Sequence, residues 1–499
     1  MNRLNSILMF QQQLFNWTLV PLARTLKKKF GCKLYLQVPL KESKNDFLGR
    51  GGDEVFEEIF VHRTGYDGLF IPVSVQDRDR IVEEAKALEE KYGFRAMRDI
   101  LQDDRHLGIG FMRGGPLHPR SWFSRAGNRY TALRLMKEQF DYYERLFDET
   151  QVDLILGGGG GFSGKPLGLI ARRRNIPLRI LCSARHKDYW YFAENEFGET
   201  PRIKDAFDKL DESVEMVQPI VPLSASKVKG RVVRNLEFLP SAKRAGKTAL
   251  KQLYYKLRRY DKARSYFISD NVRLILREHS QARELQKYAR TSLEYLKGTR
   301  FLFFPLQTEP EATLTTFSPE FTDQICALRE IALNLPSDTL LAVKEHVYAI
   351  GRRPHGFYRH LVEIPNIAFI DPMEDGLEVV KKSIAVATIS STAGQEAAIL
   401  GKPVISFGQH NIYSFLDHVH VVKGWSELPG IVDAVCRGTS QAEEERRKKQ
   451  GARFLNALES ISLDMEKMDM YRNGFGKRPD ASEEEAELIL ETLLESVFR

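Results

Sequence analysis

Cysteine is scarce in this sequence, and no long apolar run is present. The four cysteines lie far apart, with no CxxC pair and no metal-ligand spacing, and they are Cys32, Cys182, Cys326 and Cys436. This spacing fits buried thiols in a reducing compartment and makes a structural zinc site unexpected. A content of 42% hydrophobic and 28% charged residues is that of an ordinary globular protein. Because chains beyond roughly 250–300 residues tend to divide into domains, 499 residues predict two large lobes.

The amino-terminal stretch Leu4–Ala23 lacks charged residues, yet it is too polar to be a membrane span. The glutamines at positions 11–13, Asn16 and Pro21 interrupt it, whereas a spanning helix needs about 20 predominantly apolar residues. A secretory signal would need a continuous apolar core and a small-residue cleavage site, and neither is clear. We therefore expect a first amphipathic helix here and a cytoplasmic protein, with contact at the inner face of the membrane left open.

Positive charge is concentrated in one part of the chain. Lys227–Arg290 holds 18 basic and 5 acidic residues, a charge of +13, so the rest of the chain carries −6 within the total of +7. The plainest interpretation is a solvated helical face. An anionic membrane surface or glycolipid is the second, since each basic side chain near lipid headgroups contributes on the order of 1 kcal/mol. Nucleic acid is not expected as a partner, because no recognisable nucleic-acid module accompanies this block.

Short apolar runs alternate with helix-compatible stretches through the first half, which favours βαβ units and a mainly parallel sheet. The runs expected as strands are Leu34–Val38, Leu69–Val73, Leu107–Phe111, Leu154–Leu156 and Leu178–Leu181. Phe140–Leu146 is one of the helical stretches. The basic block is expected to be largely helical, because Leu250, Leu253 and Leu257 recur at near-helical intervals among charges.

A second set of alternations begins at Phe301 and predicts a second doubly wound lobe. Strands are expected at Phe301–Phe304, Leu340–Val343, Ile367–Ile370, Ile384–Ile389 and Val404–Phe407. Helical segments such as Phe321–Leu333 and Gly376–Lys382 separate them. Near the end, Ser482 and Glu485 form a capping-box pattern ahead of an amphipathic final helix, which needs an apolar partner surface from either lobe.

These patterns predict an α/β protein made of two Rossmann-like doubly wound lobes with a ligand cleft between them. We expect an amino-terminal lobe over residues 1–225 and a basic helical segment over 226–295. A carboxyl-terminal lobe over 296–480 and a final helix over 481–499 complete the expected organisation.

Polar clusters follow three of the apolar runs in the second half. They are Gln307-Thr308-Glu309, Lys344-Glu345-His346 and Ser390-Ser391-Thr392. In an open parallel sheet the ligand crevice lies at the carboxyl ends of the strands, so clusters at those ends face a common cleft. The three clusters together predict a nucleotide-sugar site.

The serine cluster lies where a helix is expected to begin. Free backbone N–H groups and the helix dipole favour an anion there, and the hydroxyls of Ser390, Ser391 and Thr392 add donors for a phosphate. Glu396 follows one turn later and is assigned to the same donor site. Plain N-capping explains the same residue types, so that alternative stays open.

Cationic side chains accompany the second cluster. Lys344, His346 and Arg352 place donors where a phosphate would lie. His346 can donate to a phosphoryl oxygen, or protonate it as the sugar departs. A lone histidine is more often structural, but here the lysine, the histidine and the serines are expected at neighbouring strand ends.

The first cluster combines an amide with carboxylates. Gln307, Glu309 and Glu311 could contact a base, a ribose or the hydroxyl groups of the sugar. The alternative is that the two carboxylates only pair with nearby arginines, because two acidic residues in one loop are common.

In the first half, the glycine run Gly157–Gly161 follows the strand expected at Leu154–Leu156. Glycine lets the backbone approach a ligand closely and exposes N–H donors. The run is neither a Walker loop nor a clean dinucleotide fingerprint. We expect an acceptor or sugar contact through Gly159, Gly160 and Ser163, with a plain flexible turn as an equal alternative.

Arg185 and His186 follow the next expected strand and are candidates for the acceptor side of the cleft. Glu194 and Glu196 lie nearby in the sequence. The residue types alone do not single out one of these four for acceptor activation.

Taken together, these clusters resemble the capsule polysaccharide biosynthesis protein family, which includes bacterial β-Kdo transferases of capsule assembly. The segments that carry the resemblance lie within Phe301–Tyr413 and read FFPLQTEPEAT, VKEH, GRRPHGFY, PNIAFIDP and ATISSTAGQEAAILGKPVISFG. The family's QxE element falls on Gln307 and Glu309, and its HP element falls on His346, where Val347 replaces the proline. The first half resembles the family only in outline, through its glycine run and strand spacing.

The resemblance implies a two-lobed GT-B glycosyltransferase that transfers Kdo or a related ulosonic acid from a CMP-sugar to a glycolipid or polysaccharide. It makes Glu309 and His346 the catalytic candidates, with the nucleotide sugar on the second lobe and the acceptor on the first. A monophosphate leaving group needs no metal in principle, so we expect no metal and no cofactor. A transferase that uses a UDP- or GDP-sugar, and a non-catalytic component of capsule assembly or export, stay open as alternatives.

Overall fold

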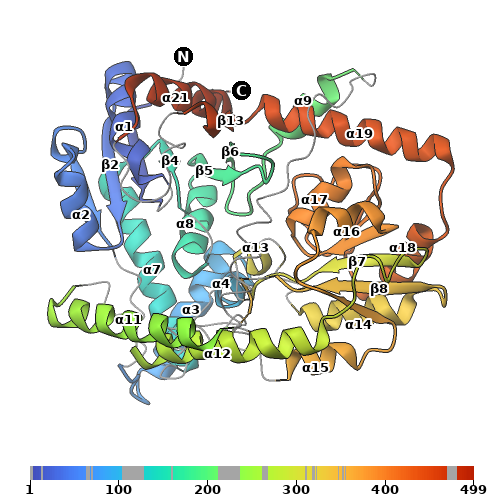
Figure 1. The fold of residues 1–499 in the computed structure, drawn as a ribbon. Helices are drawn as coiled ribbons and strands as arrows, with labels where there is room; N and C mark the ends of the chain where they lie inside the picture. Colours follow the sequence, from blue (N-terminus) through green and yellow to red (C-terminus); the bar gives the residue numbers. More distant parts are fainter. Residues whose placement is uncertain are drawn as a thin grey trace.

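The computed structural model shows two α/β lobes side by side, the first on the left of Figure 1 and the second on the right. The parts of the chain that it describes are residues 4–12, 15–62, 68, 71–103, 128–158, 161–211, 237–260, 268–309, 312–316, 318, 321, 323–346, 348–350, 353, 356–468 and 480–498. Each lobe is built on one sheet. The predicted α/β class with two doubly wound lobes is therefore confirmed.

The first sheet has seven strands in the order β13-β6-β5-β4-β1-β2-β3. Its strands are β1 (Ser6–Phe10), β2 (Lys33–Val38), β3 (Glu58–Val61), β4 (Leu154–Leu156), β5 (Leu178–Ser183), β6 (Tyr189–Ala193) and β13 (Leu463–Asp464). The strands β1 to β5 pair in parallel, whereas β6 and β13 are antiparallel additions at one edge. The chain adds strands on one side of β1 first and on the other side, starting with β4, afterwards. The switch point of the first sheet therefore lies between β1 and β4.

The prediction of one amphipathic helix over Leu4–Ala23 is wrong. The segment forms the central strand β1, which is buried along its whole length, and a helix begins only at Asn16. A strand covered on both faces is a continuous apolar run without alternation, so its pattern cannot be separated from that of a short helix.

Helices on both faces of the first sheet make up the rest of this lobe. They are α1 (Asn16–Phe30), α2 (Lys41–Leu48), α3 (Arg78–Tyr92), α4 (Ala96–Asp103), α7 (Arg129–Thr150), α8 (Gly161–Arg173) and α9 (Arg202–Lys209). The predicted helical stretch Phe140–Leu146 lies inside α7, whose first turn is fixed by a capping box between Asn128 and Thr131. The strand expected at Leu69–Val73 is wrong for its described part, 71–73, and Leu107–Phe111 lies outside the described residues.

The second sheet has six parallel strands in the order β9-β8-β7-β10-β11-β12. They are β7 (Arg300–Pro305), β8 (Thr339–Lys344), β9 (Ile367–Ile370), β10 (Ala385–Thr388), β11 (Val404–Ser406) and β12 (Val419–Val421). All five strands predicted for this lobe are confirmed. The order is that of a dinucleotide-binding fold, and its switch point, where such sheets bind ligands, lies between β7 and β10.

Both faces of the second sheet are covered, which explains its apolar strands. Phe301 and Phe303 of β7 point into one hydrophobic cluster, while Leu302 and Phe304 point into the other. The covering helices are α13 (Ala312–Thr315), α14 (Gln324–Asn334), α15 (Phe357–Val362), α16 (Gly376–Lys382), α17 (Thr392–Ile399) and α18 (Leu428–Cys436). The predicted helix Phe321–Leu333 corresponds to α14, and Gly376–Lys382 is α16.

The described part of the basic block forms two long helices, α11 (Phe238–Leu257) and α12 (Ile268–Tyr288), which pack against each other. Figure 1 shows both along the lower edge of the molecule. Within the described part of the chain, no helix combines the length and the apolar character needed to cross a membrane.

The carboxyl-terminal part of the chain crosses back from the second lobe to the first. Helix α19 (Gln441–Ser460) packs on α17 of the second lobe and on α9 of the first (Figure 1). Helix α21 (Glu483–Phe498) then packs on α1, and its predicted capping box is present between Ser482 and Glu485. The exact bounds of the lobes stay a prediction, although β13, within the range expected for the second lobe, pairs with β6.

Gly451 sets the distance between α19 and α17. A Cβ atom built on it would lie 2.1 Å from the carbonyl oxygen of Ile399. Because this oxygen belongs to the backbone of α17, it can move aside only if the helix itself shifts. We expect Gly451→Ala to lower the free energy of unfolding by about 1–3 kcal/mol, the usual cost of overpacking. Gly430→Ala in α18 is the matched control, because its Cβ would meet nothing within 4 Å. Urea unfolding of both variants would measure this, and equal stability of the two would contradict the close contact.

Candidate functional site

The loops that follow β7 and β10 are joined at the switch point of the second sheet. The side-chain amide of Gln307 donates to Ser390 Oγ at 2.9 Å, and its Oε1 accepts from the Ser390 N–H at 3.1 Å. The backbone of Gln307 is held in turn by Gln324, which accepts at 2.6 Å and donates at 3.0 Å. Two of the three predicted clusters therefore meet where neighbouring strands place them.

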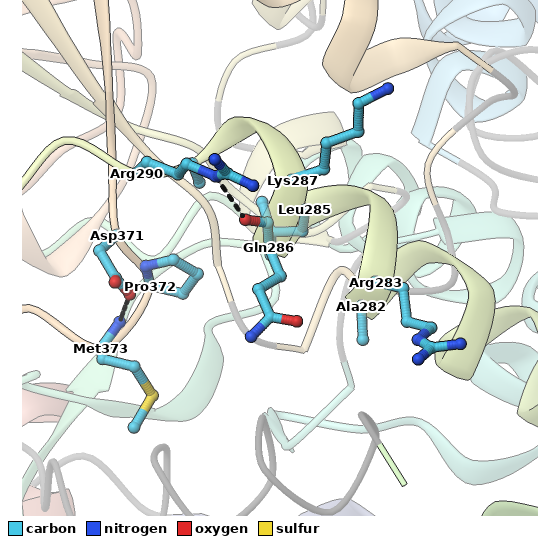
Figure 2. A pocket seen from close by; sticks show the side chains of 10 residues that line it. Ala282, Arg283, Leu285, Gln286, Lys287, Arg290, Asp371, Pro372 and Met373 are labelled. Carbon is cyan, nitrogen blue, oxygen red and sulfur yellow. Dashed lines mark hydrogen bonds between the residues drawn. The ribbon is translucent and has the colours of Figure 1, made fainter. Parts of the chain in front are cut away.

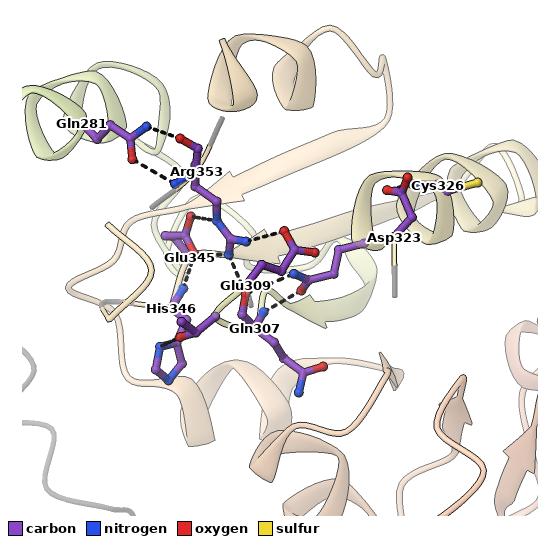
Figure 3. Close-up of polar contacts among 10 residues, drawn as sticks. Gln281, Gln307, Glu309, Asp323, Cys326, Glu345, His346 and Arg353 are labelled. Carbon is purple, nitrogen blue, oxygen red and sulfur yellow. Dashed lines mark hydrogen bonds and ion pairs between the residues drawn. The ribbon is translucent and has the colours of Figure 1, made fainter. Parts of the chain in front are cut away.

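A buried arginine joins the loops after β7 and β8 (Figure 3). Arg353 is 1% exposed, and its guanidinium binds both carboxylate oxygens of Glu345, at 2.9 and 2.7 Å. It also donates to Glu309 Oε2 at 3.1 Å and to the Gln307 carbonyl at 2.7 Å. These carboxylates raise the pKa of Arg353 above its usual value despite burial. Glu309 thus takes part in the arginine pairing that the sequence left open as an alternative, and a catalytic role for it stays a prediction.

Helix α12 fixes the backbone of Arg353. Gln281 accepts from the Arg353 N–H at 3.2 Å and donates to its carbonyl at 2.7 Å, and Arg277 donates to the same carbonyl at 2.7 Å. Part of the basic block is therefore a structural support of this site and not only a solvated face. Site roles for Arg353, Glu345 and Gln281 were not predicted from the sequence, in which the one available signal was the pair of arginines at 352 and 353.

His346 lies at the exposed mouth of the site. Its Nδ1 accepts from the Tyr348 N–H at 3.3 Å and lies 3.0 Å from the hydroxyl oxygen of Thr308. Because Nδ1 accepts, this pattern assigns the proton of the neutral ring to Nε2. The backbone N–H of His346 donates to Glu345 Oε1 at 2.6 Å, which ties the histidine to the arginine cluster.

Lys344 ends strand β8 next to this cluster and is partly buried. Burial lowers its pKa, while the carboxylates of Glu345 and Asp375 act in the opposite direction. In the described part of the chain, the Lys344 ammonium has no hydrogen bond or ion pair. It is a cation held close to acidic neighbours without a direct partner among them.

The serine cluster starts helix α17 as predicted. Ser391 is the N-cap: its Oγ accepts from the Gly394 N–H at 3.3 Å and from the Thr388 hydroxyl at 2.7 Å. The N-capping alternative is therefore confirmed for Ser391, and Thr392 is the first residue of the helix. Plain capping leaves the other N–H groups of the first turn available for a ligand.

Glu396 lies one turn into α17 and is largely shielded from water. Burial raises its pKa from 4.5 to about 7, with a further contribution from the carboxylate of Asp375. Perturbed carboxyls of this kind are common at functional sites. The sequence assigned Glu396 to the donor site, and that assignment stays a prediction.

Arg185 reaches from the first lobe into the second. It adopts a positive φ of 53°, unusual for an arginine, and its guanidinium donates to the Ser390 carbonyl. Next to it, the Ala184 carbonyl accepts from Gln395 of α17 at 2.7 Å. The acceptor-side candidate Arg185 thus lies beside the serine cluster.

His186 is not part of the same cluster. It is 2% exposed and lies 3.1 Å from Glu459 of α19, so it joins the β5–β6 turn to the crossing helix. Burial lowers its pKa, and Glu459 opposes that shift. The contact gives His186 a structural explanation.

The described glycines of the run, Gly157, Gly158 and Gly161, lie at the switch point of the first sheet. Gly157 and Gly158 adopt positive φ of 92° and 99°, and a Cβ on Gly157 would lie 3.1 Å from the carbonyl oxygen of Phe10. The Gly161 N–H at the start of α8 donates to the Asp103 carboxylate, so a protein carboxylate occupies that position. Ser163 lies in the first turn of α8.

Asp103 also joins the two lobes, and its role was not predicted from the sequence. It is 2% exposed and accepts from the hydroxyl of Thr315 at 2.9 Å and from that of Thr316. Both threonines belong to the α13 region of the second lobe. A single aspartate outside any recognisable motif gives no signal in one sequence.

Four of the predicted site residues lie outside the described residues. They are Gly159, Gly160, Glu311 and Arg352, together with Val347 of the motif. In the part of the chain that the structure describes, no group of three or more His, Cys, Asp or Glu side chains is placed to hold a metal ion.

A cavity of about 660 Å³ lies beside the loop after β9 (Figure 2). The carboxyl-terminal part of α12 lines it, with Arg283 and Arg290, and so do Asp371, Pro372 and Met373. None of the predicted site residues lines this cavity.

The comparisons with known proteins agree with the resemblance found in the sequence. The profile of the capsule polysaccharide biosynthesis protein family matches residues 219–416, which include the whole Gln307, His346 and Ser390 constellation. The matched region covers less than half of the chain, and it includes strands β7 to β11 of the second parallel-sheet lobe. No curated protein matches the sequence significantly.

Several solved structures are similar in outline. UDP-GlcNAc 2-epimerase from Neisseria meningitidis bound to UDP-GlcNAc aligns over 98% of this chain and 99% of its own, with 12% identity and a TM-score of 0.30. The KpsC beta Kdo 2,7 transferase of Thermosulfurimonas dismutans aligns over 62% of this chain and 78% of its own, with 14% identity and a TM-score of 0.28. Its beta Kdo 2,4 transferase aligns over 60% and 79%, with 14% identity and a TM-score of 0.29.

Arg353 is predicted to be the main polar support of the site. Arg353→Met would leave Glu345 and Glu309 buried without their counter-charge, so we expect a loss of about 3–5 kcal/mol in the free energy of unfolding. Arg359→Met is the control, because its ion pair with Glu363 is solvent-exposed and worth about 1 kcal/mol or less. Chemical denaturation measures both, and a loss below about 1 kcal/mol for Arg353→Met would contradict the proposed support.

Glu396 is predicted to make stability depend on pH. Its folded pKa of about 7 exceeds the reference value of 4.5, so between these values the native state binds more protons than the unfolded state. The free energy of unfolding should therefore fall as pH rises through this window, by up to about 1.4 kcal/mol per pH unit from this group. Glu396→Gln should remove that contribution and become more stable relative to wild type toward higher pH.

Urea unfolding of wild type and variant at several pH values tests the shift. Other carboxyls cancel in the difference between the two proteins. Glu491→Gln, at an exposed position of α21, is the control and should leave the pH dependence unchanged. A pH-independent difference between wild type and Glu396→Gln would show that the carboxyl is not shifted.

Proposed function

We propose that the protein is a glycosyltransferase of bacterial capsular polysaccharide biosynthesis, with its nucleotide-sugar donor bound at the carboxyl ends of β7, β8 and β10. The observation that carries the proposal is the hydrogen-bonded junction of the three loops at the switch point. Gln307 holds Ser390, and Thr308 contacts His346. The family match over residues 219–416 supports the capsule assignment.

The leaving phosphate of the donor is proposed to lie between Lys344, His346 and the first turn of α17. As the bond to the sugar breaks, the phosphate gains negative charge. The Lys344 ammonium, the Nε2–H of His346 and the N–H groups at the helix start would stabilise that charge. Lys344 is partly desolvated, and a charge attracts a phosphate more strongly there than in bulk water. In the described part of the chain no direct partner neutralises its ammonium, so this charge is available to the phosphate.

The nucleoside is proposed to lie over the second turn of α17. Ionised Glu396 can accept hydrogen bonds from ribose hydroxyls, and Gln307 and Glu309 contribute through the arginine-supported loop. Glu311 and Arg352 remain candidates on the same loops. We propose that a CMP-linked ulosonic acid such as Kdo is the donor, and that the reaction uses neither a metal nor another cofactor.

The acceptor is proposed to approach from the first lobe. Arg185 lies at the junction with Ser390, and Ser163 and the glycine run lie at the switch point of the first sheet. A glycolipid or polysaccharide acceptor fits the capsule assignment. We propose a cytoplasmic protein that contacts the inner face of the membrane through the basic segment 227–290.

A panel of nucleotides tests the donor. CMP, UDP and GDP are added to the protein in separate thermal unfolding experiments, and ligand bound only by the native state raises the unfolding temperature. We expect CMP to give the largest rise. Lys344→Gln should reduce this rise, because the variant loses the cation at the phosphate, whereas Lys381→Gln on the exposed side of α16 should keep it.

The outcomes separate the alternatives. A larger rise with UDP or GDP would assign a different nucleotide sugar to the same fold. No rise with any of the three nucleotides would contradict a donor site and favour a non-catalytic role in capsule assembly. An equal effect of the two lysine variants would place the ligand away from Lys344.

A further inference from the structure

Helix α11 presents a row of leucines to solvent. Leu239, Leu250 and Leu257 are 78%, 70% and 74% exposed, and Leu253 is 46% exposed. At 3.6 residues per turn, the spacings of 11, 7 and 18 residues among the first three place them on one face of the helix. The opposite side, with Ser241 and Ala245, is buried against α12. Helix α11 therefore exposes large apolar side chains on the side that faces away from α12.

Basic residues flank this leucine row. Lys243, Lys247 and Lys251 follow each other at four-residue intervals along one side of it, and all three are exposed. No acidic residue occurs within α11, Phe238–Leu257. In the described part of the chain, none of the three lysines forms an ion pair. Their charge is available to an outside partner.

The combination of an exposed leucine row with unneutralised lysines discriminates among partners. A soluble globular protein rarely exposes a contiguous apolar surface without a partner. A second copy of α11 would bring the same lysines together, and the repulsion disfavours that contact. A nucleic acid would use the lysines and leave the leucines in water.

We propose that α11 docks in the interface of an anionic phospholipid bilayer, with Leu239, Leu250 and Leu257 among the acyl chains and Lys243, Lys247 and Lys251 at the lipid phosphates. An amphipathic helix with a basic flank binds such a surface through buried apolar area and charge together. Lysine stems can extend upward so that the ammonium reaches the headgroups. This assigns the membrane contact proposed above to one face of one helix.

Helix α12 connects this surface to the donor site. Near its start, α11 is tied to α12 by the ion pair of Arg244 with the buried Glu278. Arg277, the residue before Glu278, and Gln281, three residues after it, hold the backbone of Arg353. A membrane-bound α11 would therefore hold the donor lobe at a fixed distance from the lipid surface, where a glycolipid acceptor is found.

Vesicle flotation tests the proposal with the full-length protein. Vesicles of phosphatidylcholine alone are compared with vesicles that also contain phosphatidylglycerol. We expect binding to the anionic vesicles and little to the neutral ones. Leu250→Ser with Leu257→Ser should weaken partition to anionic vesicles by about tenfold or more, because two large apolar side chains no longer leave water. Leu333→Ser, at a leucine of α14 that is 79% exposed, is the matched control and should bind like wild type.

A charge-reversal series tests the lysines separately. Lys243→Glu, Lys247→Glu and Lys251→Glu combined should abolish the preference for phosphatidylglycerol. The same change at Lys29, Lys297 and Lys449, which are exposed elsewhere, should keep it. Unfolding temperature and the response to CMP are measured for each variant. They should match wild type, so that loss of vesicle binding is separated from misfolding and from failure of the donor proposal.

Three results would overturn the inference. The first is wild-type protein that stays unbound with both kinds of vesicle. The second is a leucine variant that floats with anionic vesicles as wild type does. The third is a wild-type dimer that becomes monomeric in the leucine variant without any vesicle binding, which would make the leucine row a contact between copies of the chain.

Discussion

The ion pairing of one buried arginine supports the whole of the proposed donor side of this protein. Taking a guanidinium out of water costs several kcal/mol, so it persists only where its donors are matched by acceptors. Arg353 meets this condition with Glu345, Glu309 and the Gln307 carbonyl. Glu345 also accepts from the His346 N–H, and the side chain of Gln307 holds Ser390. The positions of the histidine and of the serine loop therefore both depend on the arginine.

Much of the second lobe could be predicted from the sequence, because its strands are apolar runs buried on both faces and separated by regular helices. Burial on both faces also explains why β1 was not predicted, since the uncharged run Ser6–Phe10 fits a helix as well as it fits a strand. Within the site, the residues that could be predicted are those whose positions are determined by the ends of the strands. The parts played by Arg353 and Gln281 could not be predicted, because they depend on how a loop and a distant helix pack.

The two lobes meet beside the switch points of their sheets. Arg185 reaches the Ser390 carbonyl, Gln395 reaches the Ala184 carbonyl, and Asp103 binds Thr315. Each contact links an element near the glycine run or the β5–β6 turn to a loop or a helix of the second lobe. The donor and acceptor sides proposed here are thus held together by hydrogen bonds, and a ligand cleft between the lobes stays a prediction.

The most direct test of the central claim is a crystal structure with bound CMP. We predict the phosphate at the carboxyl ends of β7, β8 and β10, within hydrogen-bond distance of Lys344 and of the first turn of α17, with Arg353 still paired to Glu345. Density for the nucleotide at another surface, with Lys344, His346 and Ser391 uninvolved, would contradict the account.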